Sequence, residues 1–417
     1  MKICFVLDEN LYRPAGVQYY ILGLADRLVA DGHQVTVLHS ANRAVEEHPI
    51  NPGIRVHEIA KGFDVPYFSP NGGVSVFPGI ASGKKLNAIL DNNKFDVFHF
   101  NYPFSPFVSG AVLQKLKKLE PGTSNPSKKV GTFHVYVEES KLKIFANKML
   151  GYLNRPHTNL IDNFINTGQP TEHYGRKYVS RESNYVPIGL QNNTKQQPDK
   201  SGSIKILFLG RLQKRKGILD FLDTLKILKD RGLLNNARIT VAGDGPVRDK
   251  AEQKAGQYGL QVDFLGTVHK QKNKLYRQAD IAVFPTKYGE TFGIVLLEAM
   301  NNHAVATGFA NAGYRSTMGE LGKDYLVESG DTIALADLLE KLLRMDRETL
   351  RRHKVRQKEF FNRHFDIENT YQSILDVYRS DYRSNIIESN DRAALKTFIT
   401  DTKNRLAELV VGIETKR

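Results

Sequence analysis

The sequence predicts a two-domain α/β protein in which each half is an open parallel sheet flanked by helices. Three observations predict this fold class. Short apolar runs alternate with amphipathic stretches along both halves of the chain. The length of 417 residues corresponds to two or three domains. A polar segment rich in structure-breaking residues, Gln191–Ser203, separates the two halves and is expected to be the interdomain linker.

The first half opens with a βαβ unit. Lys2–Leu7 is expected to be a buried strand, Ala15–Val29 an amphipathic helix and Gln34–Leu38 the next strand. Gly16 lies in the loop before the helix, where a glycine would let a backbone N–H approach a diphosphate closely. A glycine that is merely tolerated at a helix start is the alternative.

The first half continues with further predicted strands and one long loop. We expect strands at 54–59, 94–100, 128–134, 159–166 and 183–189, and a helix at 108–119. The segment 62–78 is rich in glycine, proline and aromatic residues, which indicates a functional loop rather than a core element.

His134 stands at the carboxyl end of a predicted parallel strand. Ligands of open parallel sheets bind outside this edge, so His134 is placed for binding or chemistry, although a structural histidine is the alternative. The stretch that follows, 138–154, has lysines set among apolar residues at helical spacing. It predicts a basic amphipathic helix that lies either on an anionic membrane surface or on the sheet.

The second half repeats the βα pattern after the linker. We expect strands at 204–209, 238–242, 261–265 and 280–284, and helices at 217–231, 247–258, 273–278, 292–300, 332–345, 347–363 and 367–382. The tail after 382 has the spacing of one or two amphipathic helices and suggests no function. Two open α/β domains that face each other would enclose a ligand cleft between them.

A basic loop follows the first strand of the second half. Gly210, Arg211 and Lys216 precede a helix. A guanidinium fork and an ammonium group at this position suit a diphosphate and would stabilise its charge as it departs. A solvated basic loop is the alternative.

The segment Val283–Met300 carries the strongest functional signal. A strand ends at Pro285, and a loop leads into a helix, so several free backbone N–H groups and the positive end of the helix dipole point at one spot that suits a phosphate. Glu290 and Glu298 add carboxylates that suit the hydroxyl groups of a sugar and a ribose. The backbone groups expected to bind the nucleotide sugar here belong to Thr291, Phe292, Gly293 and Ile294. A βα unit with two surface glutamates is the alternative.

Composition and charge limit the partners. Lys and Arg total 59 against 45 Asp and Glu, a net charge of +14, which favours an anionic partner such as a nucleoside diphosphate, a lipid headgroup or a nucleic acid. Basic residues are interleaved with acidic ones, so nucleic acid is the least favoured of these. Neither a signal peptide nor an 18-residue apolar run is found, and the single cysteine, Cys4, cannot form a disulfide within the chain. We expect a cytoplasmic protein.

The ordered motifs resemble those of family 4 retaining glycosyltransferases, the glycosyltransferase group 1 enzymes of GT-B fold. Glu290-Thr-Phe-Gly-Ile-Val-Leu-Leu-Glu298 looks like their E-x7-E signature, and the loop Gly210–Gly217 is similar to their G-R and K-G pattern. Within the family the chain looks most like the phosphatidylinositol mannosyltransferases, through Pro14–Gln18, Pro66–Gly72, Gly131–His134 and Gly289–Val295.

This resemblance implies two facing Rossmann-like domains, 1–192 for the acceptor and 204–365 for the nucleotide sugar, with 193–203 as linker and 366–417 as helices that pack back on the first domain. It implies transfer of a hexose, mannose or glucose, from a GDP- or UDP-sugar with retention and without an obligatory metal ion, although Mg²⁺ can take part. Arg211, Lys216, Glu290 and His134 would be catalytic. Glu298 would bind the ribose and Val268 the base, and Gly16, Gly210 and residues 291–294 would also contact the donor.

The acceptor stays open. An anionic membrane lipid such as phosphatidylinositol is what the resemblance implies, with a peripheral position on the inner face of the cytoplasmic membrane. The family's loop arginines are replaced here by Val74–Pro78, which favours a soluble or polysaccharide acceptor. A sugar-nucleotide epimerase, a phosphorylase and a non-catalytic anion or nucleic-acid-binding protein are more remote alternatives. The sequence predicts no oligomeric state.

Overall fold

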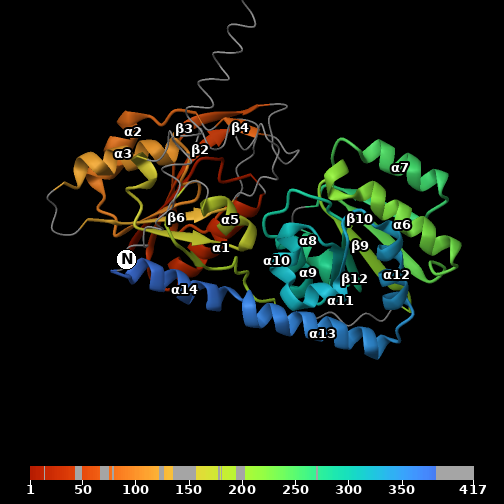
Figure 1. Ribbon diagram of the computed structural model, residues 1–417. Helices are drawn as coiled ribbons and strands as arrows, with labels where there is room; N and C mark the ends of the chain where they lie inside the picture. Colours follow the sequence, from red (N-terminus) through yellow and green to blue (C-terminus); the bar gives the residue numbers. More distant parts are fainter. Residues whose placement is uncertain are drawn as a thin grey trace, which may run out of the picture.

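The protein has two α/β lobes joined by a pair of helices that run beneath both (Figure 1). The computed structural model describes residues 1–13, 15–42, 49–65, 75–77, 79–121, 126–134, 156–176, 179, 181–193, 202–268 and 271–381. The predicted helix 138–154, the tail after 381, Pro14 and most of the segments 66–78 and 193–203 lie outside these residues. The prediction of two open parallel α/β sheets is confirmed.

The N-terminal lobe is built on an eight-stranded sheet of order β4-β3-β2-β1-β5-β6-β7-β8. Every pair is parallel except β3 with β4. The strands are β1 (Lys2–Leu7), β2 (Gln34–Asn42), β3 (Ile54–Val65), β4 (Ser75–Phe77), β5 (Val97–Phe100), β6 (Lys128–Phe133), β7 (Asn163–Asn166) and β8 (Ser183–Tyr185), and the helices are α1 (Gly16–Ala30), α2 (Gly83–Asn92), α3 (Val108–Leu119) and α5 (Gln169–Arg176).

Strand β1 is buried on both faces because it lies in the middle of this sheet. Ile3, Phe5 and Leu7 pack in the core that contains α1, whereas Cys4 and Val6 pack in the core that contains α2 and α3. A strand covered on both faces reads as a continuous apolar run, which is why it was recognisable from sequence.

The structure corrects the predicted loop at 62–78 at its two ends, 62–65 and 75–77, whereas 66–74 lie outside the described residues. Strand β3 continues to Val65, and Phe63 pairs with Phe77 of the antiparallel strand β4. Helix α2 was also missed. Its N-cap residue Ser82 accepts a hydrogen bond from Lys85 N, and Leu86 and Leu90 are its buried residues. Both elements are short and are stabilised by pairing and packing with distant segments, which local patterns do not reveal.

The C-terminal lobe has a six-stranded, fully parallel sheet of order β11-β10-β9-β12-β13-β14. Strands β13 and β14, and α10 and α11, were not predicted. The strands are β9 (Ile204–Leu209), β10 (Ala237–Ala242), β11 (Val262–Gly266), β12 (Ile281–Phe284), β13 (Val305–Phe309) and β14 (Leu326–Val327), and the α-helices are α6 (Ile218–Asp230), α7 (Arg248–Gln257), α8 (Lys272–Gln278), α9 (Ile294–Asn301), α10 (Ala312–Met318), α11 (Gly322–Tyr325), α12 (Thr332–Leu343), α13 (Arg347–His364) and α14 (Ile367–Arg379).

Helix α14 crosses back to the N-terminal lobe, as predicted (Figure 1). Arg27 of α1 forms a bidentate pair with Glu368, at 2.7 and 2.9 Å. Farther along α14, the Tyr378 hydroxyl lies 2.6 Å from Nδ1 of the fully buried His99. Helix α14 therefore completes the core of the first lobe.

The chain passes between the lobes twice, at neighbouring positions. Leu190 and Asp366 form a parallel bridge, and Leu190 N donates to Phe365 O at 2.9 Å. Lys358 holds this junction, since its Nζ donates to Asn192 Oδ1 at 2.6 Å and to Asn301 Oδ1 at 2.7 Å. Burial lowers the pKa of Lys358 to about 8.

No helix in the described part of the chain is long and apolar enough to span a membrane. The domain limits that we placed at 192, 203 and 365 stay a prediction.

Candidate active site between the lobes

A cavity of about 780 Å³ lies between the two lobes. The cavity is lined by residues of both lobes, which come from β1, α1, β6, β9, β10, α8 and α9 or from the loops beside these elements. All twelve residues that the sequence singled out are on its wall: Gly16, His134, Gly210, Arg211, Lys216, Val268, Glu290, Thr291, Phe292, Gly293, Ile294 and Glu298. These residues span most of the chain, so the fold brings every one of them to a single place.

The N-terminus of α9 presents unused backbone donors to the cavity. Among the described residues, no acceptor is hydrogen-bonded to the N–H groups of residues 291–295. Gly293, the N-cap residue, has a φ of 89°, and a Cβ at this position would lie 2.5 Å from the Tyr314 ring. Only glycine fits here, and the donors together with the helix dipole suit an anion.

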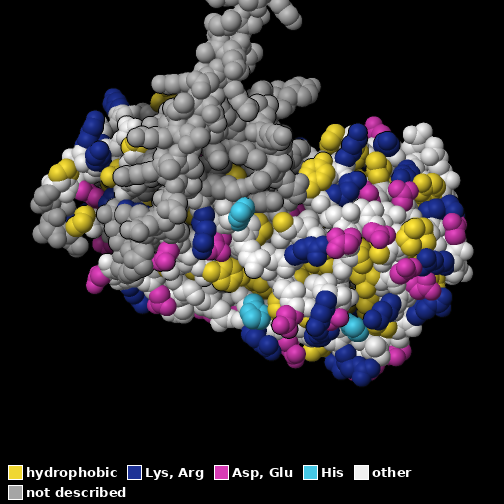
Figure 2. Space-filling view, viewed as in Figure 1, with side chains coloured by type: hydrophobic (Ala, Val, Ile, Leu, Met, Phe, Trp, Pro, Cys, Tyr) yellow, Lys and Arg dark blue, Asp and Glu magenta, His cyan; other side chains and the backbone are white. Residues whose placement is uncertain are grey.

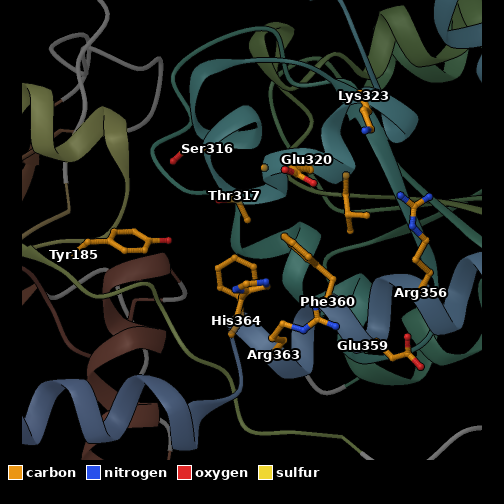
Figure 3. Close-up of a pocket in the computed structure, with 13 residues that line it drawn as sticks. Tyr185, Ser316, Thr317, Glu320, Lys323, Arg356, Glu359, Phe360, Arg363 and His364 are labelled. Carbon is orange, nitrogen blue, oxygen red and sulfur yellow. The ribbon is translucent and has the colours of Figure 1, made fainter.

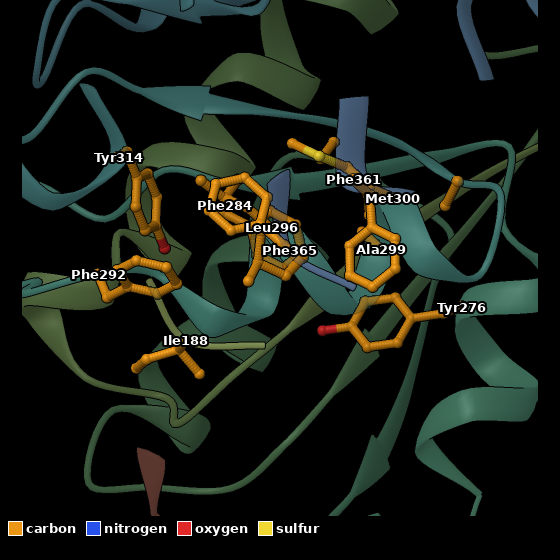
Figure 4. Close-up of a cluster of buried hydrophobic side chains, with 14 of the residues drawn as sticks. Ile188, Tyr276, Phe284, Phe292, Leu296, Ala299, Met300, Tyr314, Phe361 and Phe365 are labelled. Carbon is orange, nitrogen blue, oxygen red and sulfur yellow. The ribbon is translucent and has the colours of Figure 1, made fainter. Parts of the chain in front are cut away.

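The segment before α9 is anchored by a buried aromatic cluster (Figure 4). Phe292 packs edge-on against Phe365 at 5.8 Å between ring centroids. The hydroxyl of the fully buried Tyr314 donates to Thr286 Oγ1 at 3.2 Å, and burial raises its pKa. This packing and this hydrogen bond fix the position of the backbone N–H donors.

Glu290 is ion-paired with the basic loop at the wall of the cavity. Its Oε1 accepts from Lys216 Nζ and, at 3.3 Å, from Arg215. The Glu290 side chain is 14% exposed, and a carboxylate has further lone pairs available for hydroxyl groups. Gly217, which follows Lys216, has a φ of 75° and would clash with Pro285 O if it carried a Cβ. The loop is thereby fitted against the end of β12.

Arg211 and Gly210, which were also predicted in this loop, are not paired with Glu290. Arg211 is exposed at the cavity wall. Gly210 lines the cavity too, but its N–H donates to Ala242 O at 3.0 Å and is therefore used within the lobe. A contact of Gly210 with a diphosphate would have to come from a group other than this amide.

Glu298 is held by two residues of α8. Its Oε1 accepts from Lys272 Nζ, and its Oε2 accepts from the Tyr276 hydroxyl at 3.3 Å. Burial, followed by the Glu298 charge, raises the pKa of Tyr276. The Lys272 ammonium also lies 4.4 Å from the ring centroid of Tyr19, in the other lobe. This cation–π contact links the two walls of the cavity.

The N-terminal wall comes close to α9. A Cβ added at Gly16 would lie 3.1 Å from Ile294 Cδ1. Nearby, Gln18 Nε2 donates to Glu9 Oε2 at 3.1 Å and to Asn10 O at 3.0 Å. The lobes are therefore nearly in contact at the first turn of α1.

His134 lines the cavity from the end of β6. Its Nε2 lies 3.0 Å from Asn101 Oδ1, and its ring packs against Tyr20 at 4.8 Å between centroids. Burial lowers the pKa of His134 to about 3. Burial and the neighbouring His134 also lower the pKa of His99 to about 3. Both imidazoles are neutral at physiological pH.

The two histidines predict how stability depends on pH. The pKa values of both histidines are lower in the folded protein than in the unfolded chain. Between pH 6.5 and 3 the unfolded chain therefore binds protons that the folded protein does not bind. The stability that the two neutral histidines contribute is consequently lost as the pH falls. The free energy of unfolding should fall by up to about 2.7 kcal/mol per pH unit from these two groups. Urea unfolding at several pH values measures this slope. The His134→Gln variant should lose about half of the histidine contribution, and equal slopes in the variant and the wild-type protein would contradict the assignment.

A second cavity, of about 590 Å³, lies beside α13 (Figure 3). It contains none of the twelve residues. Cationic and anionic side chains alternate around it, and Arg356 is already paired with Asp324 at 2.8 Å. Its lining selects no ligand class, so the cavity between the lobes is the candidate active site. Over the described residues, no three His, Cys, Asp or Glu side chains lie close enough together to hold a metal ion.

Several cavity residues were missed by the sequence reasoning. They are Glu9, Arg13, Tyr19, Tyr102, Arg215, Asp244 and Lys272. Arg215 lies inside the basic loop and could have been included with Lys216. Lys272 carries no comparable signal, because its partners Glu298 and Tyr19 come from distant parts of the chain. His269, beside Val268, lies outside the described residues.

Comparison with known structures supports the fold. The crystal structure of HepE from Anabaena with UDP and glucose covers 91% of this chain and all of its own, with a TM-score of 0.68 and 17% identity. Sucrose-phosphate synthase from Thermosynechococcus elongatus gives a TM-score of 0.65 at 18% identity over 91% of this chain and 98% of its own. The fold is therefore that of a GT-B glycosyltransferase.

Comparison of sequences gives the family. The model of Glycosyltransferase Family 4 matches residues 14–184, and that of glycosyl transferases group 1 matches residues 191–359. An uncharacterized glycosyltransferase of Methanocaldococcus jannaschii is 31% identical over 329 residues, 72% of this chain and 78% of that protein. The phosphatidyl-myo-inositol mannosyltransferase of Mycobacterium leprae is 28% identical over 392 residues, 91% and 97% of the two chains. The chain belongs to the group 1, family 4 glycosyltransferases, which transfer sugars from nucleotide-sugar donors.

Proposed function

We propose that this enzyme transfers a hexose, mannose or glucose, from a GDP- or UDP-sugar to a hydroxyl group with retention at the anomeric carbon. The observation that carries the proposal is the arrangement of Glu290 and Lys216 beside the free amides of α9 in one cavity. The amides and the cations of the basic loop bind the diphosphate, and Glu290 binds hydroxyl groups of the donor sugar. Glu298 binds the ribose, and Val268 lies where the base is expected.

In the proposed step, the bond between the anomeric carbon and the diphosphate oxygen breaks, and the acceptor oxygen bonds to the same face of that carbon. The acceptor proton passes to the departing diphosphate. Arg211, Lys216 and Arg215 stabilise the charge that develops there, the work that a metal ion performs elsewhere. We therefore expect transfer to continue in EDTA.

We propose an anionic membrane lipid as the acceptor. The mycobacterial relatives support this, since they are phosphatidyl-myo-inositol mannosyltransferases. Exposed apolar side chains at one edge of the N-terminal lobe support it too. Phe63 is 57% exposed and Ile80 is 82% exposed, and Gly79 lies against the backbone of the exposed Lys61. Apolar groups beside a lysine suit an anionic membrane surface.

A soluble or polysaccharide acceptor is the second candidate. The replacement of the family's loop arginines by Val74–Pro78 favours it, although Val74 and Pro78 lie outside the described residues. Nucleic acid remains the least favoured partner. On the face shown in Figure 2, Lys and Arg side chains of the C-terminal lobe are interspersed with Asp and Glu, which is unlike the basic stripe of a nucleic-acid-binding surface.

A donor panel tests the proposal. Purified full-length protein is incubated with labelled GDP-mannose, UDP-glucose, UDP-N-acetylglucosamine or UDP-galactose and liposomes with or without phosphatidylinositol, with Glu290→Ala as control and a parallel EDTA series. We expect label in the lipid phase with one hexose donor, only with phosphatidylinositol, and independent of EDTA. Proton NMR of the product reports the anomeric configuration. Glu290-dependent hydrolysis of a donor without lipid labelling would instead favour the soluble acceptor.

A further inference from the structure

The side chain of Asn101 is fixed in one orientation. Asn101 follows β5 and is fully buried. Its Nδ2 lies 3.4 Å from Val6 O and 3.3 Å from His99 O. Both of these atoms are carbonyl oxygens that only accept hydrogen bonds, so the reversed amide would place its oxygen against two other oxygens. The network therefore assigns the NH₂ group to the carbonyls and leaves Oδ1 facing His134.

This orientation determines where His134 carries its proton. Asn101 Oδ1 can only accept, and it lies 3.0 Å from His134 Nε2, so the hydrogen of the neutral imidazole must be on Nε2. The other ring nitrogen, Nδ1, then has a free lone pair. Within the described part of the chain it makes no hydrogen bond, although His134 lines the cavity between the lobes.

We infer that Asn101 is a positioning residue that holds His134 in the Nε2–H tautomer, so that Nδ1 accepts a hydrogen bond from a sugar hydroxyl in the cavity. The inference rests on the proposed function, since this hydroxyl belongs to the donor sugar or to the acceptor. Asn101 itself is buried behind the imidazole and acts through it. His134 thereby selects substrates that offer a hydroxyl donor at this point and does not donate a proton from Nδ1.

The tautomer can be measured without any substrate. The ¹⁵N NMR shifts of the imidazole nitrogens of the full-length protein separate a protonated from an unprotonated ring nitrogen, and the signals of His134 are those lost in His134→Gln. We expect Nε2 of His134 to be protonated and Nδ1 unprotonated at pH 7. A proton on Nδ1 of the wild-type protein would overturn the inference, whatever reaction the enzyme catalyses.

Two variants of Asn101 test the functional consequence. Asn101→Asp with a protonated carboxyl group keeps both an acceptor oxygen for Nε2–H and a donor for Val6 O or His99 O, whereas Asn101→Leu has a similar volume and neither group. Asn101→Leu should show both tautomers and lose about tenfold in kcat/KM with GDP-mannose or UDP-glucose, whichever is turned over. Asn101→Asp should restore the Nε2–H tautomer and most of the rate at pH values at which its carboxyl group is protonated. Melting curves by circular dichroism verify that each variant is folded.

Separate assays identify the source of the hydroxyl. If Asn101→Leu raises KM for donor hydrolysis without acceptor, the hydroxyl belongs to the donor sugar. If only KM for the acceptor rises, it belongs to the acceptor. A folded Asn101→Leu variant with wild-type kinetics would overturn the functional part. If wild-type protein turns over neither donor, the proposed function fails, while the NMR result still decides the tautomer.

Discussion

Replacing Glu290 by glutamine is expected to lower the turnover number of sugar transfer by about 10²–10³-fold. The variant keeps the volume and one carbonyl oxygen but removes the charge on which Lys216 and Arg215 converge. Without the carboxylate, the sugar hydroxyls lose their charged acceptor, and the two cations no longer have a fixed position. Both losses raise the free energy of the transition state, because its stabilisation depends on the positions of the cations and of the sugar.

The same variant should not weaken the binding of the nucleoside diphosphate. Lys216 and Arg215 are released from their partner and become available to the phosphates. We therefore expect a large fall in kcat from initial-rate assays, together with an unchanged or smaller Kd for UDP or GDP by calorimetry. Glu320→Gln, an exposed residue of the same lobe, is the matched control. A Glu290→Gln enzyme that turns over at the wild-type rate would refute the role of Glu290.

Replacing Gly16 by valine is expected to reduce kcat/KM for transfer by about 100-fold while leaving the protein folded. A Cβ at Gly16 already lies 3.1 Å from Ile294 Cδ1, so the two methyl groups of valine have no room between α1 and α9. Gly16 belongs to one lobe and Ile294 to the other. The bulk would therefore push the lobes apart at the candidate active site rather than disrupt the core of either lobe.

Gly23→Val is the matched control, because Gly23 lies on the same helix and a Cβ there meets no atom within 4 Å. Both variants should melt at similar temperatures, and only Gly16→Val should lose activity. Small-angle scattering would show whether it also adopts a more open shape. Equal activities in the two variants would mean that close contact between Gly16 and Ile294 is not needed for transfer.

Elements of the fold could be predicted from the sequence where neighbouring residues alone determine the local structure. The strand, loop and helix that contain Glu290 and Glu298 were predicted because a buried strand, a proline and glycines follow one another directly. The position of Lys216 was predicted for the same reason. By contrast, β4 and the end of β3 that pairs with it were taken for part of a loop, because these segments are recognised as strands only through their pairing with each other.

The partners of the predicted residues could not be predicted. Lys272 reaches Glu298 and Tyr19, which are close to it only in the folded protein. The sequence placed His134 at a strand end but could not show which of its nitrogens carries the proton, because that depends on Asn101, 33 residues earlier in the chain. Local patterns therefore indicated the residues of the candidate site, whereas the hydrogen bonds and ion pairs among them became visible only in the folded structure.

The return of α14 to the first lobe has a consequence for how the protein is made. His99 is completely buried, and one of its two hydrogen-bonding partners, Tyr378, is 279 residues further along the chain. At a synthesis rate of about 5–20 residues per second, roughly 15–55 s pass between the appearance of the two residues at the ribosome. During that time the second lobe can fold, whereas the first lobe exposes the surface that α14 will cover. The lobe that is synthesised first is therefore completed last.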